Sequence, residues 1–124
     1  MPELTDDELA DQGSYLTAYY GAVEILTREQ EYWCGIAKGM AGTQSDRAMA
    51  AATGAGIGQK LLALESKHGA IMDRYDSGVK PPSAAAVKKS IQLTEKLAKD
   101  IRVQVVASKV LGVVAAFVEA WSKL

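Results

Sequence analysis

The sequence predicts an all-α protein, an antiparallel bundle of three long, heptad-patterned helices with a short N-terminal helix before them. Apolar residues recur in alternating steps of three and four along most of the chain, which is typical of helices that pack side by side. Only three prolines interrupt the 124 residues, and 48% of the residues are apolar, as in a folded globular protein. We expect residues 1–124 to form one domain, because domains commonly contain about 100–150 residues.

The first predicted helix is short and covers residues 6–12. Thr5 and Glu8 have the spacing of a capping box, in which each side chain accepts a hydrogen bond from the other residue's backbone N–H. Gly13 is expected to end this helix, since glycine readily takes the left-handed conformation that closes helices. Ser14 can then cap the helix that follows.

Two long helices are predicted next, over residues 14–39 and 46–76. Their apolar seams begin near Leu16 and Ala50 and continue without a break to the end of each helix. Glycines separate the two segments. Asp46 places a negative charge in the first turn of the second segment, where the helix dipole favours it.

Three glycines, Gly54, Gly56 and Gly58, lie inside the second of these helices. Their spacing matches neither the GxGxxG nor the GxxxxGK[ST] phosphate-binding pattern, and no strand precedes them. Each glycine lowers helix stability by up to about 1 kcal/mol relative to alanine. We therefore expect these positions to be small so that another helix can approach closely.

The last predicted helix, residues 83–123, follows a Pro-Pro pair that ends the preceding helix, and Ser83 is its expected cap. The run 101–107 alternates and is rich in β-branched residues, so a strand is the competing interpretation. No second strand-like run is present to pair with it, which favours the helix. At 1.5 Å per residue this helix is about 61 Å long, and its C-terminal part should extend beyond its shorter neighbours.

The overhanging part of this last helix carries an apolar stripe. A patch of this kind on a soluble chain commonly marks an interface, so we expect a homo-oligomer or a complex with another protein. The predicted partner or oligomer interface consists of Val110, Val113, Val114, Phe117, Val118, Trp121 and Leu124.

The function expected from these observations is protein binding through coiled-coil surfaces, without catalysis and without a cofactor. Scaffolds, chaperones, inhibitors and secretion-associated subunits are proteins of this kind. Nucleophilic catalysis finds no support, because His68 is the only histidine and Cys34 has no histidine near it in the sequence. The lone Cys34 also cannot form an intramolecular disulfide, so the fold must depend on its core.

A metal-binding helical bundle or enzyme is one alternative. Glu65 and His68 have the Glu-x-x-His spacing with which ferritin-like bundles present metal ligands, and antiparallel packing could bring Glu24 near them. Because the chain has a single histidine, a two-metal site would have to be shared across a dimer. The competing interpretation is that His68 lies in a helix seam and sets the packing register.

A nucleic-acid-binding module that uses the basic C-terminal helix is the second alternative. Residues 1–32 carry eight acidic side chains and one basic, whereas residues 79–124 carry three acidic and eight basic. We expect these segments to pack as complementary surfaces. Nucleic acid is disfavoured because the net charge is −1 and no aromatic residues interleave the basic ones. The basic residues that this alternative would use are Lys88, Lys89, Lys96, Lys99, Arg102 and Lys109.

No membrane span is expected, since the apolar run after Lys109 has about nine residues against the ~20 required. The acidic first residues also lack the basic region and apolar stretch of a cleavable signal peptide. The sequence therefore predicts a cytoplasmic protein, and export by a route that reads no cleaved signal is compatible with it.

Overall fold

The computed structural model describes residues 6–39, 42–76, 83–102 and 106–124. Every regular element in these ranges is an α-helix and none is a strand, so the predicted all-α class is confirmed. None of the helices in the described part of the chain combines the length and the apolar content that a membrane span requires. The helices are α1 (Asp6–Lys38), α2 (Gln44–Asp76), α3 (Ala84–Arg102) and α4 (Ala107–Trp121).

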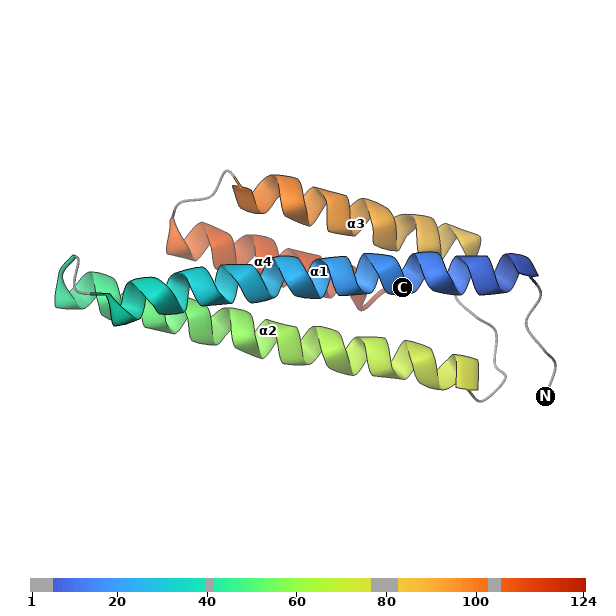
Figure 1. The fold of residues 1–124 in the computed structure, drawn as a ribbon, viewed down its shortest axis with the longest axis horizontal. Coiled ribbons are helices and arrows are strands. Elements are labelled where there is room, and N and C mark those ends of the chain that lie inside the picture. The colour runs from blue at the N-terminus through green and yellow to red at the C-terminus, as the bar shows by residue number, and fades with distance from the viewer. Residues whose placement is uncertain (1–5, 40–41, 77–82, 103–105) are drawn as a thin grey trace.

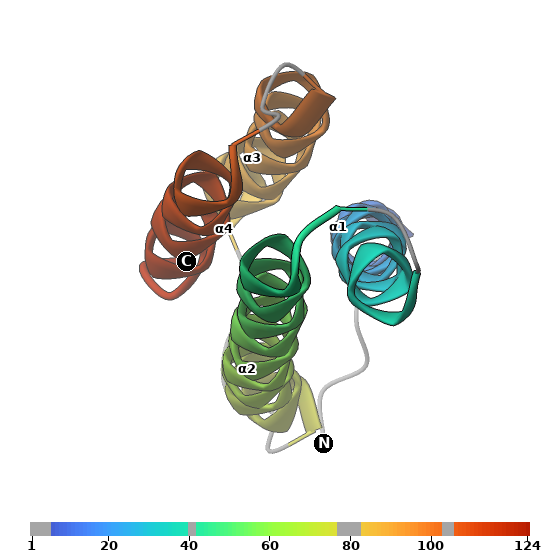
Figure 2. The ribbon, with the colours of Figure 1, turned by 90° about the vertical axis from the view of Figure 1, so that its left-hand side faces the viewer.

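The four helices form a bundle of two helix pairs (Figures 1 and 2). The first pair is α1 with α2, and the second is α3 with α4. In addition, α1 packs against α3 and α2 packs against α4, so the order around the bundle is α1, α2, α4, α3. The chain reverses direction from each helix to the next, so that α1 and α3 lie side by side and run the same way (Figure 1).

The first departure from the sequence prediction concerns Gly13. The structure has no separate helix over residues 6–12, because α1 continues through Gly13 to Lys38. A glycine alone weakens a helix by only about 1 kcal/mol, and packing of the following turn offsets that cost through the buried Tyr15 and Ala18. The hydroxyl of Thr17 also donates to the Gly13 carbonyl oxygen at 2.9 Å, as it does within a continuous helix. Thr5, the predicted capping residue, lies outside the described residues.

The second departure concerns the last predicted helix, which is not continuous. Helix α3 ends at Arg102, and α4 begins at Ala107 after Val106, whose backbone is extended at φ −102° and ψ 124°. β-Branched residues have lower helix propensity than alanine or leucine, so the valine-rich run is a weak point of the helix. A break there lets α4 fold back onto α2, which removes its apolar face from water.

The predicted overhang of the C-terminal helix is therefore wrong. The side chains that were expected to project for a partner lie mainly in the core of this chain. Val113 and Leu124 are partly buried and pack against that core. The predicted interface residues that are buried within the single chain are Val110, Val114, Phe117, Val118 and Trp121.

The three glycines of α2 confirm the prediction of close helix packing. A Cβ atom at Gly54 would lie 2.7 Å from Cys34 Sγ, and one at Gly58 would lie 2.6 Å from a side-chain nitrogen of α1. A Cβ atom at Gly56 would lie 2.8 Å from Leu111 Cδ2. Real Cβ atoms do not approach other atoms so closely, so α2 contacts both α1 and α4 through its backbone at this level.

The starts of α2 and α3 are fixed by side-chain caps. The Asp46 N–H donates to Thr43 Oγ1, and the Thr43 N–H donates to Asp46 Oδ2, each at 3.1 Å, which makes a reciprocal capping box for α2. The hydrogen bonds from the backbone and the side chain of Thr43 lower the pKa of the Asp46 carboxyl. Gly42, at φ +82°, turns the chain before this cap. Ser83 accepts a hydrogen bond from the Ala86 N–H at 3.1 Å, which confirms it as the cap of α3.

Two glycine-to-alanine replacements in α2 should change stability in opposite directions. Gly69→Ala adds a methyl group that meets nothing within 4 Å, so it should raise the free energy of unfolding by about 0.5–1 kcal/mol through helix propensity. Gly54→Ala should lower it by about 1–3 kcal/mol, because Cys34 and α1 must move to make room. Urea unfolding of both variants measures the difference. Equal stabilisation by the two alanines would contradict the close approach of α1 and α2.

Candidate interaction surface

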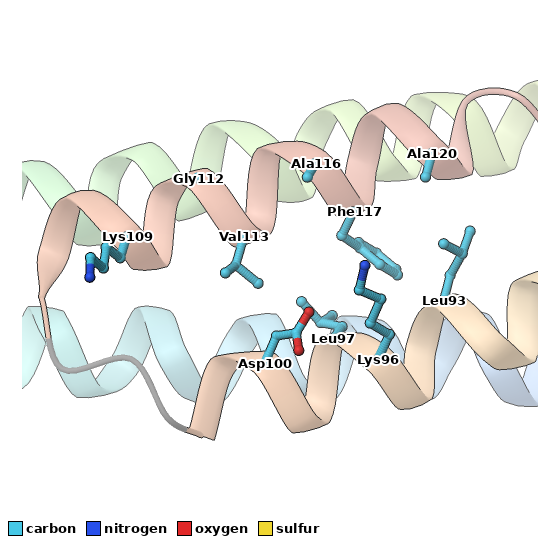
Figure 3. A pocket seen from close by; sticks show the side chains of 10 residues that line it. All are labelled: Leu93, Lys96, Leu97, Asp100, Lys109, Gly112, Val113, Ala116, Phe117 and Ala120. Atoms are coloured by element: carbon cyan, nitrogen blue, oxygen red, sulfur yellow. The ribbon is translucent and has the colours of Figure 1, made fainter.

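A groove of about 440 Å³ lies between α3 and α4 and is open to solvent (Figure 3). Both helices contribute side chains that point into the space between them. Leu97 and Phe117 are buried at its base, and Leu93 and Val113 are partly buried. We call this surface the α3–α4 groove. It is lined by Leu93, Lys96, Leu97, Asp100, Lys109, Gly112, Val113, Ala116, Phe117 and Ala120.

Small residues on α4 keep the groove open. Gly112, Ala116 and Ala120 follow one another at intervals of four residues, so they lie on one stripe of the helix. A Cβ atom at Gly112 would meet nothing within 4 Å, and Ala116 is exposed. Because these side chains are too short to reach α3, the two helices leave a channel between them that a larger side chain would fill.

Lysines dominate the rim of the groove. In Figure 3 Lys109 lies at one end of the groove, and the Lys96 side chain extends from α3 toward Phe117, with Asp100 between the two lysines. A second, shallower pocket shares Ala116 and Ala120 with the groove and extends it toward the C-terminal end of α4. The charged residues that line this extension are Lys89, Glu119 and Lys123. The groove and its extension together carry four lysines and two acidic residues, so the surface is net positive.

Phe117, at the base of the groove, is part of an aromatic cluster in the core. The Phe117 ring lies 5.5 Å from Trp121 between centroids, and Trp121 lies 5.6 Å from Tyr15. Trp121 is fully buried, and its indole N–H has no hydrogen-bond acceptor within the described part of the chain. Because Phe117 is packed against this cluster, the base of the groove is formed before any partner arrives.

His68 lies at the other side of the same cluster. The Tyr15 hydroxyl is 3.0 Å from His68 Nδ1, and the Tyr19 ring stacks on the imidazole with 3.6 Å between centroids. Burial lowers the pKa of His68, and the negative charge of Glu65 partly opposes this shift. Burial also raises the pKa of Tyr19, with smaller contributions from Glu65 and Tyr20. The neutral imidazole, with its hydrogen on Nε2, can accept the Tyr15 O–H, so His68 contributes to core packing.

The three residues of the alternative metal site do not form one group in the described part of the chain, although Glu65 lies close enough to His68 to affect its pKa. His68 faces Tyr15 and Tyr19, whereas Glu65 is exposed. Glu24 is exposed as well and pairs with Arg28 one turn away. Across the described ranges, no group of three or more His, Cys, Asp or Glu side chains is placed to hold a metal ion.

The prediction that the acidic segment 1–32 packs against the basic segment 79–124 as a complementary surface is confirmed only in part. Helix α1 does pack beside α3, as the charge split suggested. However, among the side chains that the structure describes, no lysine or arginine of α3 or α4 forms a salt bridge with a carboxylate of α1. Lys88, Lys99 and Arg102 point to solvent.

No protein family model, curated protein or solved structure matches this chain.

Sequence reasoning missed the α3–α4 groove because it treated α3 and α4 as one helix. Two signals in the sequence point to it. The valine-rich run ending at Val106 marks the break, and the four-residue spacing of Gly112, Ala116 and Ala120 marks a face that cannot fill the space beside it. Of the predicted interface residues, Val113 and Phe117 do line the groove.

His68 should make the protein less stable at mildly acidic pH. Because its pKa is lowered in the folded state, the unfolded chain binds more protons below about pH 6.5, and the free energy of unfolding falls as the pH drops through that range. In His68→Gln this part of the pH dependence should disappear. Urea unfolding of both proteins between about pH 7.5 and about pH 5 measures it. Identical pH dependence in both proteins would contradict the neutral, half-buried imidazole.

Proposed function

We propose that the protein is a non-enzymatic helical interaction protein that binds a protein helix in the α3–α4 groove. The observation that carries this proposal is the combination of a buried apolar base, a stripe of small residues and a lysine-rich rim in one open groove. Grooves between helices commonly receive an amphipathic helix, whose apolar side chains enter at intervals of three and four residues.

The length of the small-residue stripe on α4 favours a helical partner. Gly112, Ala116 and Ala120 span eight residues of α4, about 12 Å at 1.5 Å per residue. A partner helix can approach the backbone of α4 closely along this length because no large side chain intervenes. Its apolar side chains would then reach Val113 and Phe117, and the complex would add one helix to the bundle.

The chemistry of the groove also favours binding over catalysis. Its lining is apolar apart from two lysines and Asp100. The chain's only histidine, His68, lies in the core cluster instead of in the groove. Such a surface provides apolar area and positive charge. It therefore fits an amphipathic helix whose polar face is acidic.

Ala116→Glu should abolish partner binding without unfolding the protein. Ala116 is exposed and lines the groove together with its extension, so a glutamate there fills the channel and adds a negative charge. The matched control is Leu62→Glu, because Leu62 is 68% exposed on α2 and lines none of the groove. The measurement is quantitative affinity purification of both variants and the wild type from the native host.

We expect the wild type and Leu62→Glu to retain the same protein, and Ala116→Glu to lose at least about 90% of it, which corresponds to about 1.4 kcal/mol of binding free energy. Circular dichroism should show equal helix content in the three proteins. Retention of every bound protein by Ala116→Glu would contradict the assignment of the groove.

A further inference from the structure

The N-terminal turns of α1 form an acidic arm. In Figure 1 the first turns of α1 extend past the neighbouring ends of α2 and α3. Asp6 and Asp7 are exposed there, and Leu9 is 51% exposed although it is a large apolar residue. Asp6 and Leu9 are three residues apart, as are Asp7 and Ala10, so carboxylates and apolar groups lie beside one another on the helix surface. We call residues 6–11 the α1 arm.

The α1 arm has the properties that the α3–α4 groove requires of an occupant. The groove offers an apolar base with Lys96 and Lys109 in its lining, and the arm offers Leu9 with acidic residues next to it. Within the described part of the chain, these carboxylates form no salt bridge with either lysine. Charge complementarity of this kind directs encounter and orientation between two surfaces.

The arm cannot reach the groove of its own chain. Helix α1 packs against α2 and α3 and lies diagonally opposite α4 in the bundle (Figure 2). Because the arm is the start of a continuous helix, it would have to unwind and cross α3 to enter the groove. A second copy of the chain has no such restriction.

We infer that the occupant of the α3–α4 groove is the α1 arm of a second copy of this chain, so that two chains exchange arms across a two-fold axis. This inference rests on the proposed function of the groove. In such a dimer each arm–groove contact occurs twice, because a two-fold interface uses the same patches on both subunits. The charged part of the contact should weaken as salt is added, since the Debye length falls from about 10 Å at 0.1 M to about 3 Å at 1 M.

Charge reversal on each side of the contact provides the test. The arm variant is Asp6→Lys with Asp7→Lys, and the groove variant is Lys96→Glu with Lys109→Glu. The matched control is Lys88→Glu with Lys99→Glu, which changes the charge equally on exposed residues of α3 that do not line the groove. Sedimentation velocity at about 100 µM, in the range of weak association, measures the assembly of each protein alone and of mixtures.

We expect the wild type and the control to sediment as dimers and each reversed variant to sediment as a monomer. An equimolar mixture of the arm variant and the groove variant should form a heterodimer, because the basic arm then meets the acidic groove and the acidic arm meets the basic groove. Circular dichroism checks that each variant is folded. The groove variant leaves the arm sequence unchanged, so fraying of the arm cannot explain its dissociation.

Three results would overturn the inference: a monomeric wild type, dimers that persist in both reversed variants, or a mixture that stays monomeric. The proposed function is tested separately, by the binding of Ala116→Glu. If the wild type is monomeric but Ala116→Glu still loses a protein that the wild type binds, the groove serves another partner. If Ala116→Glu loses nothing, the groove is not the binding surface for any protein.

Discussion

The bundle depends on the close contact that α2 makes with two helices at Gly54, Gly56 and Gly58. These three positions have no side chain, so the first and third glycine lie against Cys34 and the Gln30 side chain of α1, and the second lies against the Leu111 side chain of α4. This arrangement fixes α4 beside α2, which brings Trp121 against Tyr15 and completes the aromatic core. Interiors are packed to near-crystalline density, so a backbone contact of this kind allows little displacement of either neighbour.

The position of α4 determines which surfaces are left for binding. Folding α4 back buries the large residues of its apolar stripe, and the small residues of the same helix are left facing α3. The α3–α4 groove is thus a consequence of how the core is completed. Its base is the outer side of Phe117, whose inner side packs on Trp121, so the groove and the core share one side chain.

Much of the fold follows from residue patterns that act locally. The three- and four-residue spacing predicted helices, and the cap at Ser83 and the close packing at Gly54 were predicted from single residues whose effects are local. Two features depended on competition between local preference and tertiary packing. Helix α1 continues through Gly13 because its later turns are buried. The predicted C-terminal helix breaks before Ala107 because burying the apolar face of α4 stabilises the fold more than an unbroken helix would. The candidate groove depended on that break as well as on the small-residue spacing of α4, so the spacing within one helix could not locate it by itself.

A single chain buries the apolar face of α4 by itself. The most direct measurement is acrylamide quenching of Trp121 fluorescence in Trp33→Phe, which leaves Trp121 as the only tryptophan. The account predicts weak quenching that is the same in concentrated solution and at a dilution where the protein sediments as a monomer, because Trp121 has 0% exposure within the chain. Quenching that rises on dilution to the level of free indole would show that a second chain is needed to cover α4, and would contradict the account.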